Sequence, residues 1–341
     1  MPFEFIQIPV VQPLLGSITA LLVFFSGKSH AVVVADGSLG ESLVLAAESA
    51  HAAVGWVGIQ EGASSYRGTG VLISSEWVLT AAHNWQSDAV TGLDFHIGGT
   101  TYSGVSGGWI QHPGWSVSPI VAHTQGWDIA LFRLSAPVPG ITPARLYSGT
   151  GELGAAITLV GAGSAGTATT GPRPNPTPQL YASTNMIDRV ISTSGETTGG
   201  LLGMDFDDGT TLHNSLTGTA IFDTLGHSVP LTNGLAVVAQ SSTGAPSMLE
   251  GTSAAGDSGG PAFADFGDGP EVVGLVSWGV NPTNPSNLYG SGSGDITYLT
   301  RVSVFNDWIY STIPEPGTLS LLLLGMPLWL MRPRARDEGR V

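Results

Sequence analysis

Short apolar runs separated by glycine, serine and proline restrict this chain to a β-rich fold more strongly than any other feature of its sequence. Residues 70–73 read GVLI and residues 155–160 read AAITLV, each close to turn-forming residues. Runs of this kind are typical of short β-strands. Glycine supplies 48 of the 341 residues, and charged residues only 11%. We therefore predict an all-β protein, built as a sandwich or a barrel.

The chain contains no cysteine, which limits both its stabilisation and its chemistry. Disulfide bonds, thiolate zinc sites and a cysteine nucleophile are all excluded. A domain of about 300 residues buries roughly 75% of the surface that its unfolded chain exposes, so it can be stable without covalent cross-links. Any catalytic nucleophile has to be an oxygen or an amine.

The formal net charge is −15, and the body of the chain is more acidic than this figure implies. Four of the eleven cationic residues lie in the last ten positions, at Arg332, Arg334, Arg336 and Arg340. An acidic surface repels phosphate groups. We therefore expect no nucleic-acid partner, and no anionic-membrane partner for the body of the chain.

The N-terminal region has the features of a secretory signal. Residues 14–25 are mostly apolar but too few to span a bilayer comfortably, and Ser29 and Ala31 place small residues before a cleavage point. We predict that residues 1–31 are a signal peptide removed by signal peptidase. Because Glu4 and no basic residue precede the apolar run, a misassigned start and an uncleaved anchor stay open, and a buried N-terminal strand is a further alternative.

The C-terminal region combines a short motif, an apolar run and a basic end. Residues 314–317 read PEPG, residues 319–331 are mostly apolar, and residues 332–336 read RPRAR. An apolar run followed by positive charge stalls in a membrane with the charge inside. The order resembles the PEP-CTERM sorting signal of Gram-negative bacteria. This resemblance implies export, transient membrane association through the tail at 313–341, and processing by an exosortase; a plain tail anchor is the alternative.

Three motifs in the body of the chain carry the ingredients of a nucleophilic site. His83 ends the run VLTAAH, Asp128 lies second in WDIALFRL, and Ser258 lies third in GDSGGP. A serine is a poor nucleophile by itself, so it needs an imidazole to accept its proton, and the imidazole needs a carboxylate that fixes its tautomer. The glycines allow backbone N–H groups to converge on one point, as an oxyanion hole requires.

These motifs resemble those of the chymotrypsin-like (trypsin-fold) serine peptidases, and the resemblance extends from about Val54 to Ile309. Supporting matches are GTGVLI before the histidine, HPG before the aspartate, VSWG after the serine and a final segment ending in WI. The order histidine, aspartate, serine is that of this family. The resemblance implies that Ser258 is the nucleophile, His83 the general base and Asp128 the residue that orients His83, with no cofactor.

The resemblance also implies the architecture. It predicts an all-β fold of two antiparallel six-stranded Greek-key β-barrels with a short C-terminal helix and with the site between the barrels. The interval from the aspartate to the serine is longer than compact members need, and we assign the surplus to an insertion. The predicted divisions are a signal peptide at 1–31, an N-terminal segment at 32–53, the first barrel at 54–140, the second barrel at 141–312 with an insertion around 164–246, and the sorting tail at 313–341.

Further site residues follow from the resemblance alone. It implies that the backbone N–H groups of Gly256 and Ser258 form the oxyanion hole. It also implies that Ser277, Trp278 and Gly279 hold the substrate backbone in an extended, strand-like pairing.

The resemblance places Thr252 at the base of the pocket for the side chain before the scissile bond, where relatives that cleave after basic residues carry an aspartate. Because threonine has no charge, we expect neutral or apolar side chains there. The alternative is that Asp295 brings a carboxylate from the opposite wall. In activated relatives a new N-terminal amine pairs with the aspartate before the nucleophile, here Asp257. We expect either that signal removal exposes Val32 for this role or that Asp257 is satisfied internally.

No catalytic metal is indicated by the sequence. The acidic stretch at 205–209 reads DFDDG and suits either a calcium ion or a plain acidic turn, but no EF-hand spacing follows. No HExxH or comparable spacing is shown by the remaining histidines, which are His30, His51, His96, His112, His123, His213 and His227.

Together these features predict a secreted serine endopeptidase that acts on polypeptides, either outside the cell or in the cell envelope of a Gram-negative bacterium. A catalytically degenerate, surface-sorted binding or matrix protein on the same scaffold is the alternative from another class. An esterase is a third possibility, because acyl transfer is shared chemistry.

Overall fold

The structure is a computed structural model that describes residues 32–85, 88–116, 123–174, 179–192, 200–217, 221–222, 228–229, 236–240, 242, 244–282 and 291–313. The predicted signal peptide lies outside the described residues, as does the predicted sorting tail apart from Ile313. Within the described ranges, no helix is both long and apolar enough to cross a membrane.

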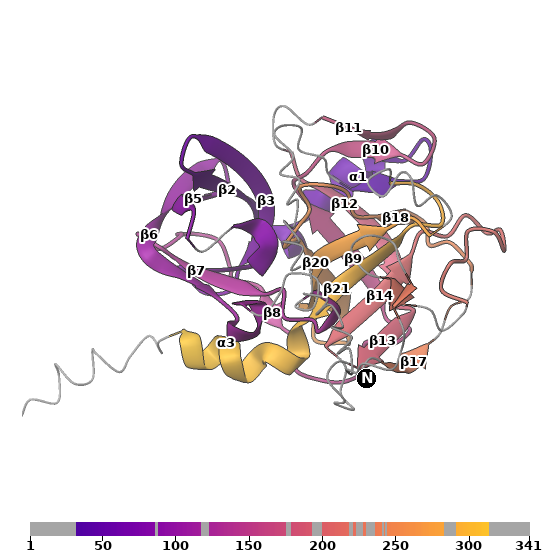
Figure 1. The fold of residues 1–341 in the computed structure, drawn as a ribbon. Helices are drawn as coiled ribbons and strands as arrows, with labels where there is room; N and C mark the ends of the chain where they lie inside the picture. The colour runs from indigo at the N-terminus through magenta and orange to yellow at the C-terminus, as the bar shows by residue number, and fades with distance from the viewer. Residues whose placement is uncertain are drawn as a thin grey trace, which may run out of the picture.

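The first half of the described chain forms a closed β-barrel, drawn in indigo and purple in Figure 1. Neighbouring strands follow the order β2-β3-β4-β7-β6-β5 around the ring. Aromatic rings fill its interior: Phe95 and Phe132 are fully buried and meet edge to face, with ring centroids 6.4 Å apart. The strands are β2 (Val54–Glu61), β3 (Ser64–Leu72), β4 (Trp77–Thr80), β5 (Val90–Ile97), β6 (Thr100–Gln111) and β7 (Ala130–Leu134).

The second half forms a curled nine-stranded sheet, with the order β12-β9-β19-β20-β21-β14-β13-β17 and with β8 paired to β20. Strand β12 lies at one end of this order and β13 lies next to the other end, and only Ile187 and Asp188 connect them. This short connection brings the two ends of the sheet close together. The N–H of Asp188 donates to the carbonyl of Gly203 in β14 at 2.9 Å. The strands are β8 (Arg145–Leu146), β9 (Ala156–Gly161), β12 (Tyr181–Met186), β13 (Arg189–Ser192), β14 (Leu201–Asp205), β17 (Ala236–Gln240), β19 (Pro261–Asp265), β20 (Pro270–Val280) and β21 (Ile296–Arg301).

The N-terminal described residues pack on this second half, although they precede the first barrel in sequence (Figure 1). A small sheet has the order β11-β10-β1-β18, in which Val33 pairs with Thr252. The helix α1 is tied to β12 because the hydroxyl of Ser42 donates to the carbonyl of Ala182 at 2.7 Å. These elements are β1 (Val33–Val34), α1 (Leu39–Ala46), β10 (Ala165–Thr167), β11 (Gly171–Arg173) and β18 (Gly251–Thr252), and a separate two-stranded sheet joins β15 (Ile221–Phe222) to β16 (Ser228–Val229).

A short C-terminal helix, α3 (Asn306–Thr312), lies along the lower side of both halves in the view of Figure 1. The ring of His112, from the first half of the chain, meets the rings of Phe305 and Trp308 edge-on, each with centroids 5.1 Å apart. Ile309 is fully buried, so the helix holds the two halves together through apolar contacts. The remaining one-turn helices are η1 (Ser49–His51), η2 (Ala82–Asn84), η3 (Pro113–Ser116) and η5 (Val302–Phe305).

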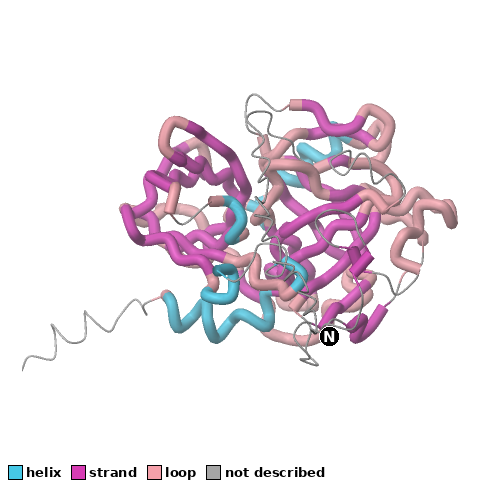
Figure 2. The backbone as a smooth tube through the Cα atoms, viewed as in Figure 1, coloured by secondary structure: helices cyan, strands magenta, loops and turns pink. Residues whose placement is uncertain are grey.

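Strands dominate the chain, as Figure 2 shows, and the predicted all-β fold with a short C-terminal helix is confirmed. The second barrel takes the form of a curled sheet with additional strands rather than a plain ring of six. One of the additional strands is β17, which joins the sheet beside β13 and lies within the predicted insertion around 164–246.

Candidate active site

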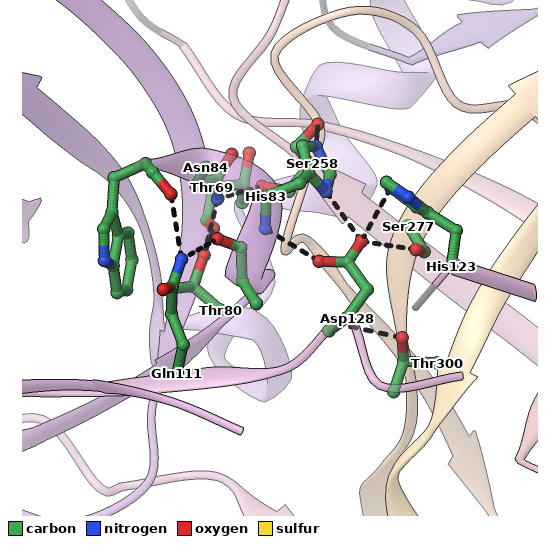
Figure 3. A network of polar contacts seen from close by, with 12 residues as sticks. Thr69, Thr80, His83, Asn84, Gln111, His123, Asp128, Ser258, Ser277 and Thr300 are labelled. Carbon is green, nitrogen blue, oxygen red and sulfur yellow. Dashed lines mark hydrogen bonds and ion pairs between the residues drawn. The ribbon is translucent and has the colours of Figure 1, made fainter. Parts of the chain in front are cut away.

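His83 lies in the one-turn helix η2, directly after strand β4 of the first barrel. All four residues of β4 are buried, so the core fixes the strand from which His83 emerges. The backbone N–H of His83 donates to Oδ1 of Asp128 at 2.8 Å, and its Nδ1 lies 2.6 Å from Oδ2 of the same carboxylate. Its Nε2 lies 2.7 Å from Oγ of Ser258 (Figure 3). The structure therefore brings together the three residues predicted to form the catalytic triad.

Asp128 is fully buried just before strand β7. Its Oδ2 faces His83 and also accepts a hydrogen bond from the hydroxyl of Ser277, and Nε2 of His123 lies 3.5 Å from it. Burial by itself would raise the pKa of Asp128, but the neighbouring imidazoles and these hydrogen bonds outweigh it and hold the pKa at about 2. The group therefore stays ionised at neutral pH.

The pKa of His83 depends on its burial and on its contact with Asp128. Burial would lower it, but the charge of Asp128 and the hydrogen bond between the two side chains raise the pKa above its ordinary value. A histidine with a raised pKa is a stronger base, which suits a group that has to accept a proton from a serine.

Contacts from the first barrel fix the loop that carries Ser258. The carbonyl of Ser258 accepts hydrogen bonds from the backbone N–H of Thr69 at 2.9 Å and from Nδ2 of Asn84 at 3.0 Å. Gly259 has a φ of +81°, and a Cβ at that position would lie 2.1 Å from Oγ1 of Thr80. Only glycine fits such a position, because the backbone is in the left-handed region and the neighbouring strand approaches too closely for a side chain.

Gly256, predicted to supply one N–H group of the oxyanion hole, has a φ of +96°. Its carbonyl accepts a hydrogen bond from Oγ1 of Thr69 at 2.9 Å. The carbonyls of Gly256 and Ser258 are thus both bound by Thr69 of the first barrel, and these contacts hold the loop on which the two predicted donors lie.

Asp257 is fully buried behind the serine. Its carboxyl accepts hydrogen bonds from the N–H groups of Ala254 at 2.9 Å and Gly163 at 3.1 Å. Burial outweighs these two hydrogen bonds and raises the pKa of Asp257 well above its ordinary value. Val32 is also fully buried, and Val33, the next residue, pairs with Thr252.

The three residues predicted to bind the substrate backbone lie in strand β20, beside Ser258 and His83. The side chain of Ser277 is directed at Asp128, as Figure 3 shows. The ring of Trp278 stacks on Tyr298 with centroids 4.6 Å apart. A Cβ on Gly279 would lie 3.4 Å from the carbonyl oxygen of Ile296, which is an ordinary van der Waals contact, so a small side chain would fit at this position.

Thr252, predicted at the base of the specificity pocket, is buried, and its hydroxyl lies 2.8 Å from Oγ1 of Thr297. Asp295 is 6% exposed, and its Oδ2 accepts a hydrogen bond from the N–H of Gly292 at 2.9 Å. Its Oδ1 has no hydrogen-bond partner among the described residues. Burial outweighs the single hydrogen bond and raises the pKa of Asp295 to about 8.

The acidic stretch at 205–209 is organised by its own neighbours. Oδ2 of Asp205 accepts a hydrogen bond from the N–H of Leu216 at 2.9 Å. Asp208 accepts hydrogen bonds from Thr210 and lies 2.5 Å from Nδ1 of His213. Among the described residues, only one group of three histidine or acidic side chains is close enough together to bind a metal ion. The acidic stretch at 205–209 does not belong to that group.

Reasoning from the sequence missed several side chains that organise the site, namely Thr69, Asn84, His123 and Thr300. Thr69 lies within the quoted motif GTGVLI, and Asn84 directly follows His83, the last residue of VLTAAH. The hydroxyl of Thr300 donates to the carbonyl of Asp128 at 3.0 Å across the two halves. No local spacing distinguishes this threonine or His123 from others of their kind, so only the fold identifies them.

The region that contains His83, Asp128 and Ser258 matches a known protein family. The family model described as Trypsin matches residues 46–209 and 232–309, which together make up more than half of the chain. No curated protein matches the chain. Among solved structures, neuropsin, a serine protease expressed in the limbic system of mouse brain, is 20% identical, with 76% of this chain and 94% of that chain covered and a TM-score of 0.47. HL collagenase is 18% identical, with 77% and 95% covered and a TM-score of 0.48.

Proposed function

The chain belongs to the trypsin family, and we propose that it is a serine endopeptidase that cleaves polypeptides through an acyl-enzyme on Ser258. The observation that carries the proposal is the series of contacts from Oδ2 of Asp128 to Nδ1 of His83, and from Nε2 of His83 to Oγ of Ser258. This series supplies a base for the serine proton and a fixed negative charge that stabilises the resulting imidazolium.

In the proposed mechanism, Oγ of Ser258 attacks the carbonyl carbon of the scissile peptide bond while Nε2 of His83 takes the hydroxyl proton. The oxyanion that forms accepts hydrogen bonds from the N–H groups of Gly256 and Ser258. His83 then gives its proton to the departing amine, and the acyl group stays on Ser258. A water molecule, deprotonated by His83, releases the acid and restores the serine. Asp128 stays ionised throughout, as its low pKa requires.

The preorganised loop is expected to supply much of the rate enhancement. Losing one donor of an oxyanion hole typically lowers turnover by about 10²–10³-fold. Thr69 supports the proposal because its contacts with the carbonyls of Gly256 and Ser258 hold the loop that carries the proposed donors before a substrate arrives. The substrate backbone would lie along Ser277–Gly279 of β20 as an additional extended strand.

We also propose that the enzyme is exported, with residues 1–31 as its signal peptide, and acts outside the cell or in the envelope of a Gram-negative bacterium. The sequence features at the two ends support this part of the proposal. Its action on polypeptides rests on membership of the trypsin family.

The test combines labelling with turnover. A serine-directed phosphonate should form a single adduct, which peptide mapping should place on Ser258, and a mixed peptide library should be hydrolysed. Ser258→Ala should lose both properties with an unchanged circular dichroism spectrum and melting temperature. Because triad residues act as a unit, we expect His83→Ala, alone or combined with Ser258→Ala, to lower turnover by a similar factor, roughly 10⁶-fold. Normal hydrolysis by a well-folded Ser258→Ala protein would refute the assignment. Hydrolysis of esters but not of peptides would instead indicate an esterase.

A further inference from the structure

A second imidazole lies against the carboxylate of the triad. Nε2 of His123 is 3.5 Å from Oδ2 of Asp128, the same oxygen that lies 2.6 Å from Nδ1 of His83 (Figure 3). The ligand atoms of the three side chains all lie within 4.8 Å of one another. The described part of the chain contains no other group of three histidine or acidic side chains with this property.

Aromatic neighbours hold the second imidazole in place. The ring of His123 meets Trp115 edge-on with centroids 4.9 Å apart, and it meets Trp278 edge-on at 5.6 Å. The side chains of His83 and His123 are 25% and 11% exposed, whereas that of Asp128 is fully buried. Both imidazoles are therefore partly open to solvent, whereas the carboxylate between them is enclosed.

We propose that His83, His123 and Asp128 bind a divalent transition-metal ion such as Zn²⁺, and that the bound ion reversibly inhibits the enzyme. The inhibition rests on the proposed peptidase function, whereas the binding does not. Two imidazole nitrogens and one carboxylate oxygen form a ligand set that zinc accepts in proteins, with a fourth position left for water. Calcium and magnesium prefer sets made of oxygen alone and are expected to bind here weakly or not at all.

The distances show what binding would change. Tetrahedral zinc with bonds of about 2.0–2.1 Å holds its ligand atoms about 3.3 Å apart. The separation of 3.5 Å between His123 and Asp128 already fits this geometry. The separation of 2.6 Å between His83 and Asp128 is too short, so the ion has to open that hydrogen bond. Metal binding and the catalytic arrangement therefore exclude each other.

The tautomer of His83 explains the inhibition. In the catalytic arrangement, Nδ1 carries the proton that it donates to Asp128, and Nε2 accepts from Ser258. A metal ion takes the lone pair of Nδ1, so the ring proton has to move through solvent to Nε2, with no net gain or loss of protons. Nε2 then becomes a donor toward Ser258 and cannot accept the serine proton. Release of the ion reverses both changes.

Zinc binding can be measured without any turnover. Isothermal titration of the full-length Ser258→Ala protein with Zn²⁺ should show one ion per chain that excess Ca²⁺ or Mg²⁺ does not displace. Adding His123→Gln, which places an amide near the position of Nε2, should weaken binding at least about tenfold, since even residues that only orient a ligand typically contribute 10–100-fold. The matched control is His213→Gln, which removes the exposed pair with Asp208 and should leave the affinity unchanged. Equal zinc affinity with and without His123 would overturn the inference.

A second readout avoids relying on one variant. Co²⁺ bound to the Ser258→Ala protein should show the strong visible absorption of a four-coordinate ion, and weak octahedral bands alone would count against the site. If His123→Gln does not fold, His123→Asn takes its place in the titration.

Inhibition is then measured on the active enzyme, with each variant compared with its own metal-free rate. Zinc should suppress hydrolysis by the native chain, a chelator should restore it, and His123→Gln should lose at least about tenfold in sensitivity to zinc. Zinc binding that requires His123 in a protein that never hydrolyses peptides would refute the proposed function alone. Hydrolysis whose inhibition by zinc does not depend on His123 would refute this inference alone.

Discussion

The hydroxyl of Ser277 donates a hydrogen bond to Oδ2 of Asp128, although the two residues are 149 positions apart in the chain. The bond connects strand β20 of the second sheet to the carboxylate that orients His83. Because Asp128 is fully buried and ionised, each donor that it keeps offsets part of the cost of removing a charge from water. The seam between the two halves therefore stabilises the charge that the proposed mechanism requires.

Ser277→Ala should destabilise the fold and slow the reaction. Removing one donor from a buried charge is expected to lower the free energy of unfolding by about 1–3 kcal/mol, and kcat should fall more than KM changes. Urea unfolding and steady-state kinetics measure the two effects. The matched control is Ser183→Ala, because Ser183 is equally buried but its hydroxyl has no hydrogen-bond partner in the described structure. An equal loss of stability in both variants would show that the bond to Asp128 contributes nothing.

Asp295 should make the protein less stable as the pH rises. Its pKa is raised from 3.8 to about 8 in the folded state, so the folded state binds more protons than the unfolded state between these values. Stability therefore falls as the pH rises through this window, by up to about 1.4 kcal/mol per pH unit for one group. Asp295→Asn should flatten the dependence when unfolding is measured at several pH values. Asp88→Asn, which removes an exposed carboxyl, is the control, and an unchanged slope in Asp295→Asn would contradict the prediction.

Cleavage should favour neutral or apolar side chains over arginine and lysine. The hydroxyl of Thr252 is bound by Thr297, so the predicted base of the pocket offers no charge to a buried guanidinium, which would lose several kcal/mol on desolvation. A mixed peptide library analysed by mass spectrometry measures the preference. A dominant preference for basic residues that disappears in Asp295→Asn would show that the pocket is charged from its other wall.

The form that begins at Val32 should be the active one. Val32 is fully buried and Val33 pairs with Thr252, six residues before Ser258, so an amine freed at Val32 would lie in the half that holds Asp257. A cation there would favour the charged form of Asp257, whose burial otherwise disfavours charge. Activity is compared between protein with residues 1–31 attached and protein processed after Ala31. Full activity in the unprocessed form would exclude this role. Asp257 would then be satisfied internally, by the backbone N–H groups of Ala254 and Gly163.

The native protein should be cut near residues 314–317. The apolar run at 319–331 is too short to span a membrane durably. We therefore expect the tail to be cut off, after which the enzyme is either released or tethered again. Mass spectrometry of material from the producing cells should find a C-terminus in or near the PEPG motif. An intact terminus at Val341 would remove support for this processing.

The sequence by itself determined the fold class, and it singled out three residues, His83, Asp128 and Ser258, whose side chains meet in the structure. Short apolar runs between turn-forming residues predict strands because this signal depends on local chain geometry alone. The triad was visible because each member lies in a local motif, and Gly259 shows why such a motif is specific. Its positive φ and its approach to Thr80 admit no side chain, so the requirement appears directly as a residue type.

Only the tertiary structure decided which other side chains reach the triad and how their charges behave. Ser277 was predicted to bind substrate, and the fold turns its hydroxyl to a carboxylate 149 residues away. His123 has no distinguishing spacing in the sequence, and it meets Asp128 because the fold places its ring beside Trp278 and His83. The raised pKa of Asp295 is likewise a property of burial. Contacts and desolvation of this kind depend on which distant segments pack together, and no local pattern of residues encodes that packing.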